Sequence, residues 1–439
     1  MITIPPRRPT GPPPGKGECV AHLLMIESWV GAMSSLLPRA IRENGHHFTF
    51  LTRDLHHYLR SAPGPGPHPL LAAENVLTAE TNDVSALLPH VRRLHDVLRF
   101  DGVITSCDYY LSTVAAVAAH LDLPGPDPRA VERAYRKDLT RSTLRAAGVP
   151  GPRFELAEGW SATAKAAAGL GYPLVVKPVD LCGGMHVRKV ADEAGLREAF
   201  LALEAFPVNA RNQPRVPSVL LEELLTGPEV SVETVTAAGV THVVGVTDKS
   251  LAGEPWFVES GHMFPADLTP ADRRAAVDTA VAAIEALGLD DAVAHTEVKL
   301  TPDGPRLIEV NPRPAGNRIT ELVRRVTGVD LPAVLAQLAV GERPSLTPAG
   351  TGVRSAAVSF LLPTRAGLVA GIDGVDALGW EPGVVDWSVK PAGHRAGDPT
   401  SNNTYLGHVV VTDVDGLGAR AKAERAVAGL TVRYAEEPA

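Results

Sequence analysis

Two glutamates and an asparagine within residues 295–317, HTEVKLTPDGPRLIEVNPRPAGN, form the pattern with the clearest chemistry. The tight turn TPDG predicts that the two apolar strands around it pair antiparallel. Glu297 and Glu309 can then face the same side, and Asn311 shares the face of Glu309 because side chains alternate along a strand. Carboxylate and amide oxygens are hard ligands that suit Mg²⁺. We therefore predict a metal site at Glu297, Glu309 and Asn311.

The alternative is that both glutamates are ordinary exposed strand residues. Their position inside apolar strands, one of them followed by the rigid NPRP, makes that the weaker interpretation. Arg313 is two residues beyond Asn311, so its planar guanidinium lies on the same edge and can hold a carboxylate or a phosphoryl group bidentately. Lys177 ends another apolar stretch, YPLVVK, and a lysine in that position must place its ammonium against an anion.

The elements that position these residues follow from hydrophobic periodicity. Strands at 22–29, 47–51 and 102–106 alternate with helices at 31–41 and 112–121, which predicts a parallel sheet with helices on its faces. Residues 131–148 form a helical pattern, and 173–190 a strand, a glycine loop and a returning strand, unlike the strand-loop-helix of a Walker site. Further strands are expected at 218–222, 229–236, 241–247, 294–300 and 306–310, and further helices at 271–287, 331–338 and 416–428.

Composition limits the classes of function. The chain has 439 residues and a net charge of −8, so it lacks the basic field of a protein that coats nucleic acid or anionic lipid. The three cysteines form no CxxC pair, which argues against a disulfide framework and favours a reducing cytoplasm. No apolar run is long enough to span a membrane, and the proline-rich residues 1–17 are expected to be a disordered tail.

The EVNPR segment with its upstream glutamate, and the other motifs in their order, resemble the ATP-grasp ligases, and most of all the carboxylate–amine ligases that join amino acids into dipeptides. The resemblance implies an α/β fold of three parts. These are a Rossmann-like N-terminal domain at 18–125, a two-lobed ATP-grasp core at 126–340, and a small β-rich C-terminal domain at 341–439. Within the core, the small lobe is expected at about 130–220 and the large lobe at about 221–340.

The same resemblance implies a nucleotide site. ATP phosphates are expected to contact Lys137, Lys177 and the backbone of a flexible loop at Gly183 and Gly184. The loop continues with Met185 and His186, where the family more often has a serine, so a side-chain phosphate contact is not implied there. The resemblance assigns the adenine edge to Glu222, Glu223 and Leu225, and the ribose hydroxyls to Glu229. It also implies ATP with Mg²⁺, two ions, and Mn²⁺ as an alternative ion.

The resemblance also implies how the substrates react. A carboxylate attacks the γ-phosphate to give an acyl phosphate, and an amine then displaces phosphate to leave an amide. Arg313 and Lys177 are expected to steady the developing charges. The loop at 255–268 supplies Glu259 for a substrate ammonium and His262 to assist removal of the amine proton. Asn317 leaves room for a larger or polar first amino acid.

The expected activity is therefore dipeptide formation with release of ADP and phosphate, and the choice between an α- and a γ-carboxylate stays open. The alternatives are an ATP-grasp ligase for another carboxylate or amine, as in biotin-carboxylase-like or purine-pathway relatives, and a silent ATP-binding regulator. The expected partners are small amino-acid substrates, and binding to nucleic acid or to a membrane is not expected. Whether the protein forms a homodimer stays open. Lys249 and His295 receive no role, and the pairs at 46–47 and 56–57 are interpreted as surface histidines because adjacent histidines do not converge on one ligand position.

Overall fold

The structure is a computed structural model that describes residues 20–28, 31–60, 68–252 and 255–435. The expected tail at 1–17 lies outside the described residues, as does the end of the first expected strand at residue 29. Within the described part of the chain, no helix combines the length and the apolar character needed to cross a bilayer.

The N-terminal part confirms the predicted parallel sheet. Its strands, in spatial order β3-β2-β1-β4, are all parallel. They are β1 (His22–Ile26), β2 (His47–Thr52), β3 (Asn75–Thr78) and β4 (Gly102–Ile104). The helices around them are α1 (Met33–Glu43), α2 (Leu55–Arg60), α3 (Val84–Leu98) and α4 (Leu111–His120), with short 3₁₀ turns η1 (Pro69–Ala72) and η2 (Asp108–Tyr110). Strand β1 is buried along its whole length, as expected for a strand covered on both faces.

The helical pattern predicted at 131–148 is interrupted in the structure. It consists of α5 (Pro128–Tyr135) and α6 (Lys137–Ala146), separated at Arg136, whose backbone is extended with ψ of 110°. The Lys137 N–H donates to the carbonyl of Val179, 3.0 Å away on another segment, rather than to the preceding turn. This tertiary contact ends one helix and starts the next, which periodicity alone does not indicate.

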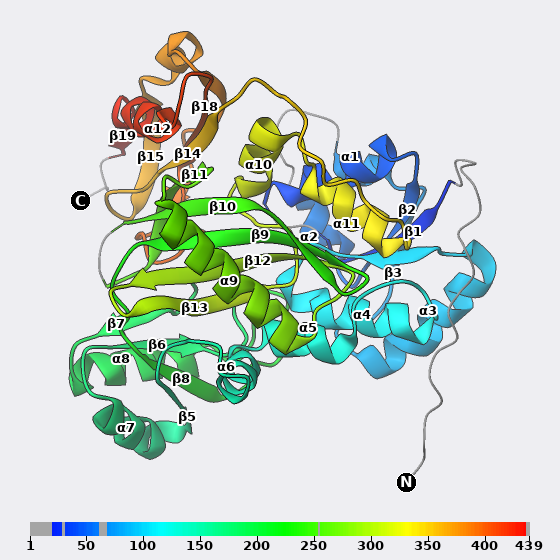
Figure 1. The fold of residues 1–439 in the computed structure, drawn as a ribbon, viewed down its shortest axis with the longest axis horizontal. Coiled ribbons are helices and arrows are strands. Elements are labelled where there is room, and N and C mark those ends of the chain that lie inside the picture. Colours follow the sequence, from blue (N-terminus) through cyan, green and yellow to red (C-terminus); the bar gives the residue numbers. More distant parts are fainter. Residues whose placement is uncertain (1–19, 29–30, 61–67, 253–254, 436–439) are drawn as a thin grey trace.

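A four-stranded antiparallel sheet, β5-β8-β6-β7, forms the small lobe. Its strands are β5 (Phe154–Glu158), β6 (Leu174–Pro178), β7 (Arg188–Val190) and β8 (Ser218–Glu223), and its helices are α7 (Gly159–Leu170) and α8 (Glu193–Glu204). The pairing of β6 with β7 confirms the strand-loop-strand predicted around the glycine loop. Figure 1 shows this lobe at the lower left, beside the large sheet.

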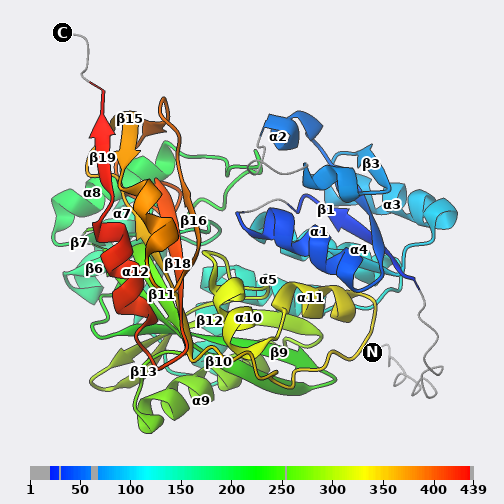
Figure 2. The same cartoon turned by 90° about the horizontal axis from the view of Figure 1, so that it is seen from above.

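The largest sheet has eight strands in the order β13-β12-β9-β10-β11-β14-β18-β16. They are β9 (Glu229–Ala237), β10 (Val240–Ala252), β11 (Val258–Phe264), β12 (Ala292–Thr301), β13 (Gly304–Asn311), β14 (Ser355–Leu361), β16 (Val384–Val389) and β18 (Gly407–Asp413). Helix α9 (Pro270–Leu287) crosses one face (Figure 1), where Val230 and Val232 pack on its alanines. Helices α10 (Ile319–Thr327) and α11 (Leu331–Ala339) cover the other face around Val235, and α11 also packs on α1 (Figure 2).

The C-terminal strands are divided between the large sheet and a small sheet of their own. Strands β14, β18 and β16 extend the large sheet through the pairing of β11 with β14. A separate small sheet contains β15 (Gly367–Asp373), β17 (Arg395–Ala396) and β19 (Thr431–Tyr434), next to η3 (Val375–Trp380) and α12 (Ala419–Ala428). The limits given above for each domain stay predictions.

Candidate active site

One cavity of about 440 Å³ lies where the N-terminal domain, both lobes and the C-terminal segment meet. Most of the residues predicted from the sequence line it. They are Lys137, Lys177, Gly183, Gly184, Glu222, Glu223, Leu225, Glu229, Glu259, Glu297, Glu309, Asn311, Arg313 and Asn317. His262 is absent from its wall. A more open groove of about 850 Å³ between α6, β5 and α7 contains none of the predicted residues.

Lys177, one of the two lysines predicted to bind phosphate, lines this cavity and is paired with a buried carboxylate. Lys177 is on β6, and its Nζ lies 2.6 Å from Oε2 of Glu222, whose Oε1 lies 2.5 Å from Nε of Arg141. Burial alone would raise the pKa of the Glu222 carboxyl, but Arg141 and Lys177 lower it to about 2. Burial lowers the pKa of Lys177 more than Glu222 raises it. The anion expected against Lys177 is thus Glu222 in this structure.

Lys137 is buried rather than solvated, although it begins a helix. Its Nζ donates to the carbonyl of Leu181 at 2.7 Å and contacts Oε1 of Glu309 at 3.1 Å. Burial opposes the charged form, but Glu309 raises the pKa of the Lys137 ammonium. A helix lysine held beside an acidic residue of the predicted metal site is well placed for a phosphate group.

The glycine loop between β6 and β7 contacts the C-terminal segment. Gly183 and Gly184 have φ of 66° and 70°, a conformation that favours glycine. The Asn402 N–H donates to the Gly183 carbonyl at 3.3 Å, and the Asn403 side chain lies next to the same glycine. The loop is therefore held against a segment more than 200 residues away.

The predicted adenine and ribose residues lie where the two lobes join. Glu223, at the end of β8, contacts Arg153 through its backbone and through its carboxylate, with Oε2 2.7 Å from Nε. Glu229 begins β9 and contacts two lysines, Lys249 and Lys299, each at 3.0 Å. Both glutamates line the cavity, as does Leu225 between them.

The prediction that Glu297 and Glu309 lie on paired antiparallel strands is confirmed. They are directly opposite each other on β12 and β13, and Asn311 is opposite His295. Glu297, Glu309 and Asn311 all line the cavity. Two carboxylates and one amide oxygen at neighbouring positions form a hard donor set that fits Mg²⁺.

Lys249 stands at the centre of the acidic residues. Its Nζ lies 2.7 Å from Oε1 of Glu297, 3.0 Å from Oε1 of Glu229 and 3.1 Å from Oε1 of Glu259, and its side chain is 2% exposed. Burial would lower the pKa of Lys249, but the three carboxylates raise it well above the usual value. Sequence reasoning left Lys249 without a role. The local sequence gives no signal, since Lys249 is flanked by Thr247, Asp248 and Ser250 on its strand.

His295 is a second buried cation that sequence reasoning left without a role. Its Nδ1 lies 3.1 Å from both carboxylate oxygens of Glu233, and its Nε2 lies 3.3 Å from Oε1 of Glu297. Burial opposes protonation, but Glu233 and Glu297 raise the pKa of the imidazole to about 9. The ring is therefore positively charged at neutral pH, and it orients Glu297.

Residues 258–264, expected in a loop, form strand β11. The Nε2 of His262 lies 3.0 Å from Oε2 of Glu259, and the Asn317 amide donates to the same oxygen. Because His262 is only 1% exposed, it can reach the cavity only through Glu259. Burial would raise the pKa of Glu259, but Lys249 and His262 hold it well below the usual value.

Arg313 lines the cavity and is held by the N-terminal domain. Its Nε lies 2.7 Å from Oδ1 of Asp108, in the turn after β4. Burial would lower the pKa of the guanidinium, and Asp108 raises it above the usual value. Asp108 was not singled out from the sequence, although ligand sites of parallel sheets lie at the carboxyl ends of strands, where Asp108 follows β4.

The C-terminal segment contributes residues that sequence reasoning did not name. The side-chain oxygen of Asn402 accepts the backbone N–H of Glu259 at 3.0 Å. Tyr405 lines the cavity and stacks on Phe360, with ring centroids 4.1 Å apart. No local pattern around these residues indicates a site, since they approach it only through the pairing of β14 and β18.

Comparisons with known proteins match three parts of the chain to family models. Residues 170–321 match the ATP-grasp domain, 39–125 the ATP-grasp N-terminal domain, and 359–435 the L-amino acid ligase C-terminal domain 2. An uncharacterized protein, y4rH of Sinorhizobium fredii, is 32% identical over 393 residues, which cover 88% of this chain and 80% of that protein.

Two relatives have described activities. The alanine–anticapsin ligase of Bacillus amyloliquefaciens is 25% identical over 221 residues, 47% of this chain and 46% of that enzyme. The crystal structure of an L-amino acid ligase from Bacillus licheniformis matches with a TM-score of 0.77 and 25% identity, covering 95% of this chain and 99% of that chain. Together with the assembled cavity, these matches show that the chain belongs to the ATP-grasp family of ADP-forming carboxylate–amine ligases.

Proposed function

We propose that this ligase joins two amino acids: ATP activates the carboxylate of the first as an acyl phosphate, and the amine of the second displaces phosphate to form a dipeptide. The observation that carries the proposal is the shared cavity. Residues suited to nucleotide phosphates, such as Lys177, and residues suited to a substrate ammonium, such as Glu259, line the same cavity. The matches to L-amino acid ligases support the same substrate class.

The nucleotide occupies the side of the cavity formed by the two lobes. Lys137 and Lys177 bind the phosphates from α6 and β6, and the N–H groups of Gly183 and Gly184 close over them. Backbone groups of Glu222, Glu223 and Leu225 face the adenine edge. The carboxylate of Glu229 accepts the ribose hydroxyls.

Glu297, Glu309 and Asn311 hold Mg²⁺, with two ions as the expected number and Mn²⁺ as an alternative. The metal neutralises charge on the phosphates when it is bound. Lys249 and His295 both contact Oε1 of Glu297, and Lys137 contacts Glu309, so these cations balance the carboxylates and keep them oriented. The carboxylate ligands are therefore already oriented in the absence of the metal ion.

Arg313 stabilises the charge that develops on the substrate carboxyl group, and Asp108 fixes the orientation of its guanidinium. Glu259 binds the ammonium group of an amino-acid substrate, and Asn317 lies beside it in the substrate pocket. The side-chain amide of Asn317 donates a hydrogen bond to Glu259. The amine must lose a proton before it attacks the acyl phosphate. His262 lies behind Glu259, with its Nε2 3.0 Å from Oε2 of that residue, and assists removal of this proton.

The test is phosphate release from ATP and Mg²⁺ with each amino acid alone and in all pairs, with mass analysis of the products. Release that requires two amino acids and yields their condensed mass supports the proposal and names the substrates. Release that requires one amino acid and an amine of another class, or no turnover with any pair, contradicts it. ATP binding without any turnover identifies a regulator instead.

A further inference from the structure

Two histidines and a glutamate gather at the edge of the N-terminal sheet that faces away from the active site. His22 opens β1, His47 opens β2 and Glu74 directly precedes β3. These strands are parallel neighbours, with His22 and His47 in register, so their amino ends present the three side chains together. The residues this sheet contributes to the cavity, such as Asp108, follow the carboxyl ends of strands. The group is therefore independent of the ligase site.

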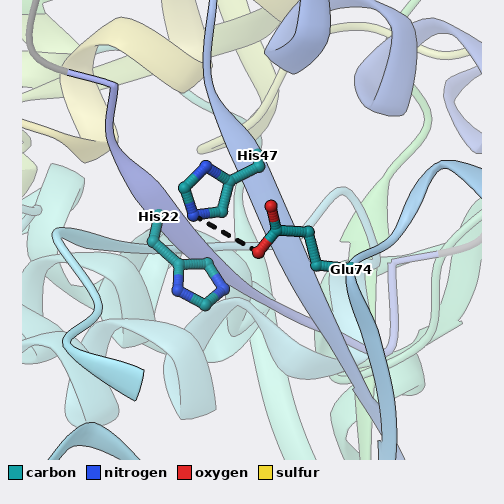
Figure 3. A group of neighbouring side chains, drawn as sticks. All are labelled: His22, His47 and Glu74. Carbon is teal, nitrogen blue, oxygen red and sulfur yellow. Dashed lines mark ion pairs between the residues drawn. The ribbon is translucent and has the colours of Figure 1, made fainter.

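We propose that His22, His47 and Glu74 bind a late first-row divalent metal ion such as Zn²⁺. One ligand atom from each lies within 4.8 Å of the others. The Nε2 of His47 is 3.5 Å from Oε2 of Glu74, and the two imidazole rings lie 4.4 Å apart at 42°. Figure 3 shows the Glu74 carboxylate reaching toward the two rings.

The chemistry of the donors selects the metal. Two imidazoles and one carboxylate suit Zn²⁺, Co²⁺, Ni²⁺ or Cu²⁺, whereas Mg²⁺ prefers oxygen ligands. Tetrahedral zinc bonds of about 2.0–2.2 Å place ligand atoms about 3.4 Å apart, so small side-chain rotations close the group around an ion. The side chains of His47 and Glu74, 30% and 54% exposed, have room to make them. Water completes the coordination on the exposed side.

A hydrogen bond holds His22 in the tautomer that can bind a metal ion through Nε2. Its Nδ1 lies 3.0 Å from the carbonyl of Leu98, which only accepts, so Nδ1 carries the proton and the lone pair is on Nε2. One group competes with the metal: Oγ1 of Thr49 lies 2.8 Å from Nε2 and donates to it, while accepting from the Asn75 amide. A bound ion replaces this single hydrogen bond.

The first experiment measures zinc in untagged, metal-stripped protein by competition with a chromophoric chelator, with saturating Mg²⁺ and ATP present to block the active site. We expect one equivalent of bound zinc and an unfolding midpoint raised by several degrees. His47→Ala and Glu74→Gln should each weaken zinc binding at least about tenfold. The exposed His56 on α2 offers the matched control, His56→Ala, which should bind zinc as the parent does. Turnover with Mg²⁺ should be unchanged in all three variants.

Thr49→Val provides a test in the opposite direction. It keeps the volume of the buried side chain but removes the hydroxyl that occupies Nε2 of His22, so zinc should bind severalfold more tightly. Cobalt in place of zinc should give the visible absorption of a four-coordinate nitrogen and oxygen site. The proposal is overturned if zinc binding is unchanged by His47→Ala and Glu74→Gln, or if no equivalent survives saturating Mg²⁺ and ATP.

Discussion

Replacement of Lys249 by methionine tests whether one buried ammonium holds the acidic cluster together. An ion pair near 3 Å contributes roughly 5.5 kcal/mol at an effective dielectric constant of 20, and much of this offsets the cost of burying the charges. Removing one partner of a buried pair costs about 3–5 kcal/mol, because the carboxylates stay behind without compensation. Lys249 contacts three carboxylates, so we expect a loss at the upper end of that range.

The assay is thermal unfolding at pH 7 without nucleotide. At about 2 °C for each kcal/mol in a long chain, a loss of about 4–5 kcal/mol should lower the midpoint by roughly 8–10 °C. Lys299→Met is the matched control: Lys299 lies in the same sheet but contacts one of these carboxylates, Glu229, and should lower the midpoint less.

The dependence on pH separates charge from packing. Lys249 holds the pKa of Glu259 and Glu297 below the ordinary value of 4.5, so their stabilisation is present above that pH and is lost as the pH falls through the lower native values. The difference between parent and Lys249→Met should therefore be widest at pH 7 and narrow below pH 4.5. A difference of less than about 2 °C at pH 7, or one independent of pH, would refute the reasoning.

Four further outcomes are expected. Glu309→Ala should abolish phosphate release while circular dichroism shows an intact fold, because it removes a metal ligand rather than core volume; activity near that of the parent would contradict the metal assignment. Arg313→Lys, which keeps the charge but loses the planar fork, should lower kcat at least about 100-fold, and a mild effect would mean that Arg313 only shapes the turn. Asn317→Trp should lower kcat/KM for large first amino acids while sparing small ones, and an unchanged substrate profile would place Asn317 outside the pocket. The pKa of His295, raised from 6.5 to about 9, predicts stabilisation of about 3 kcal/mol that is complete below pH 6.5 and lost as the pH rises through 9. Melting curves of His295→Gln should lack that pH dependence.

What could be predicted from the sequence was encoded locally. The turn TPDG and strand alternation placed Glu297 opposite Glu309, and an apolar strand ending in lysine identified Lys177 as a buried cation. Glycines between two apolar stretches indicated a loop that joins two paired strands, β6 and β7. Each inference needs only a few neighbouring residues and the regular geometry of strands.

The features missed depend on contacts between distant segments. The break between α5 and α6 follows from a hydrogen bond to Val179, and the partner of Arg313 is Asp108, 205 residues earlier in the chain. Asn402 reaches Glu259 only because β18 pairs with β14. Adjacent histidines were considered as pairs along the chain, whereas His47 meets His22 across two parallel strands. Such contacts depend on strand order and register, which one sequence does not specify.

The order of strands in the large sheet also bears on when the enzyme first becomes competent during its synthesis. Strand β18 lies between β14 and β16, and the loop before it carries Asn402 and Tyr405 to the cavity. A nascent chain that has emerged only as far as α11 contains every predicted metal ligand, but it lacks this wall and leaves the edge of β11 unpaired. Pairing between such distant segments is slow to form, and unpaired strand edges invite aggregation. While the last quarter of the chain is being translated, the edge of β11 is thus exposed. This exposure ends when β14 and β18 add to the sheet.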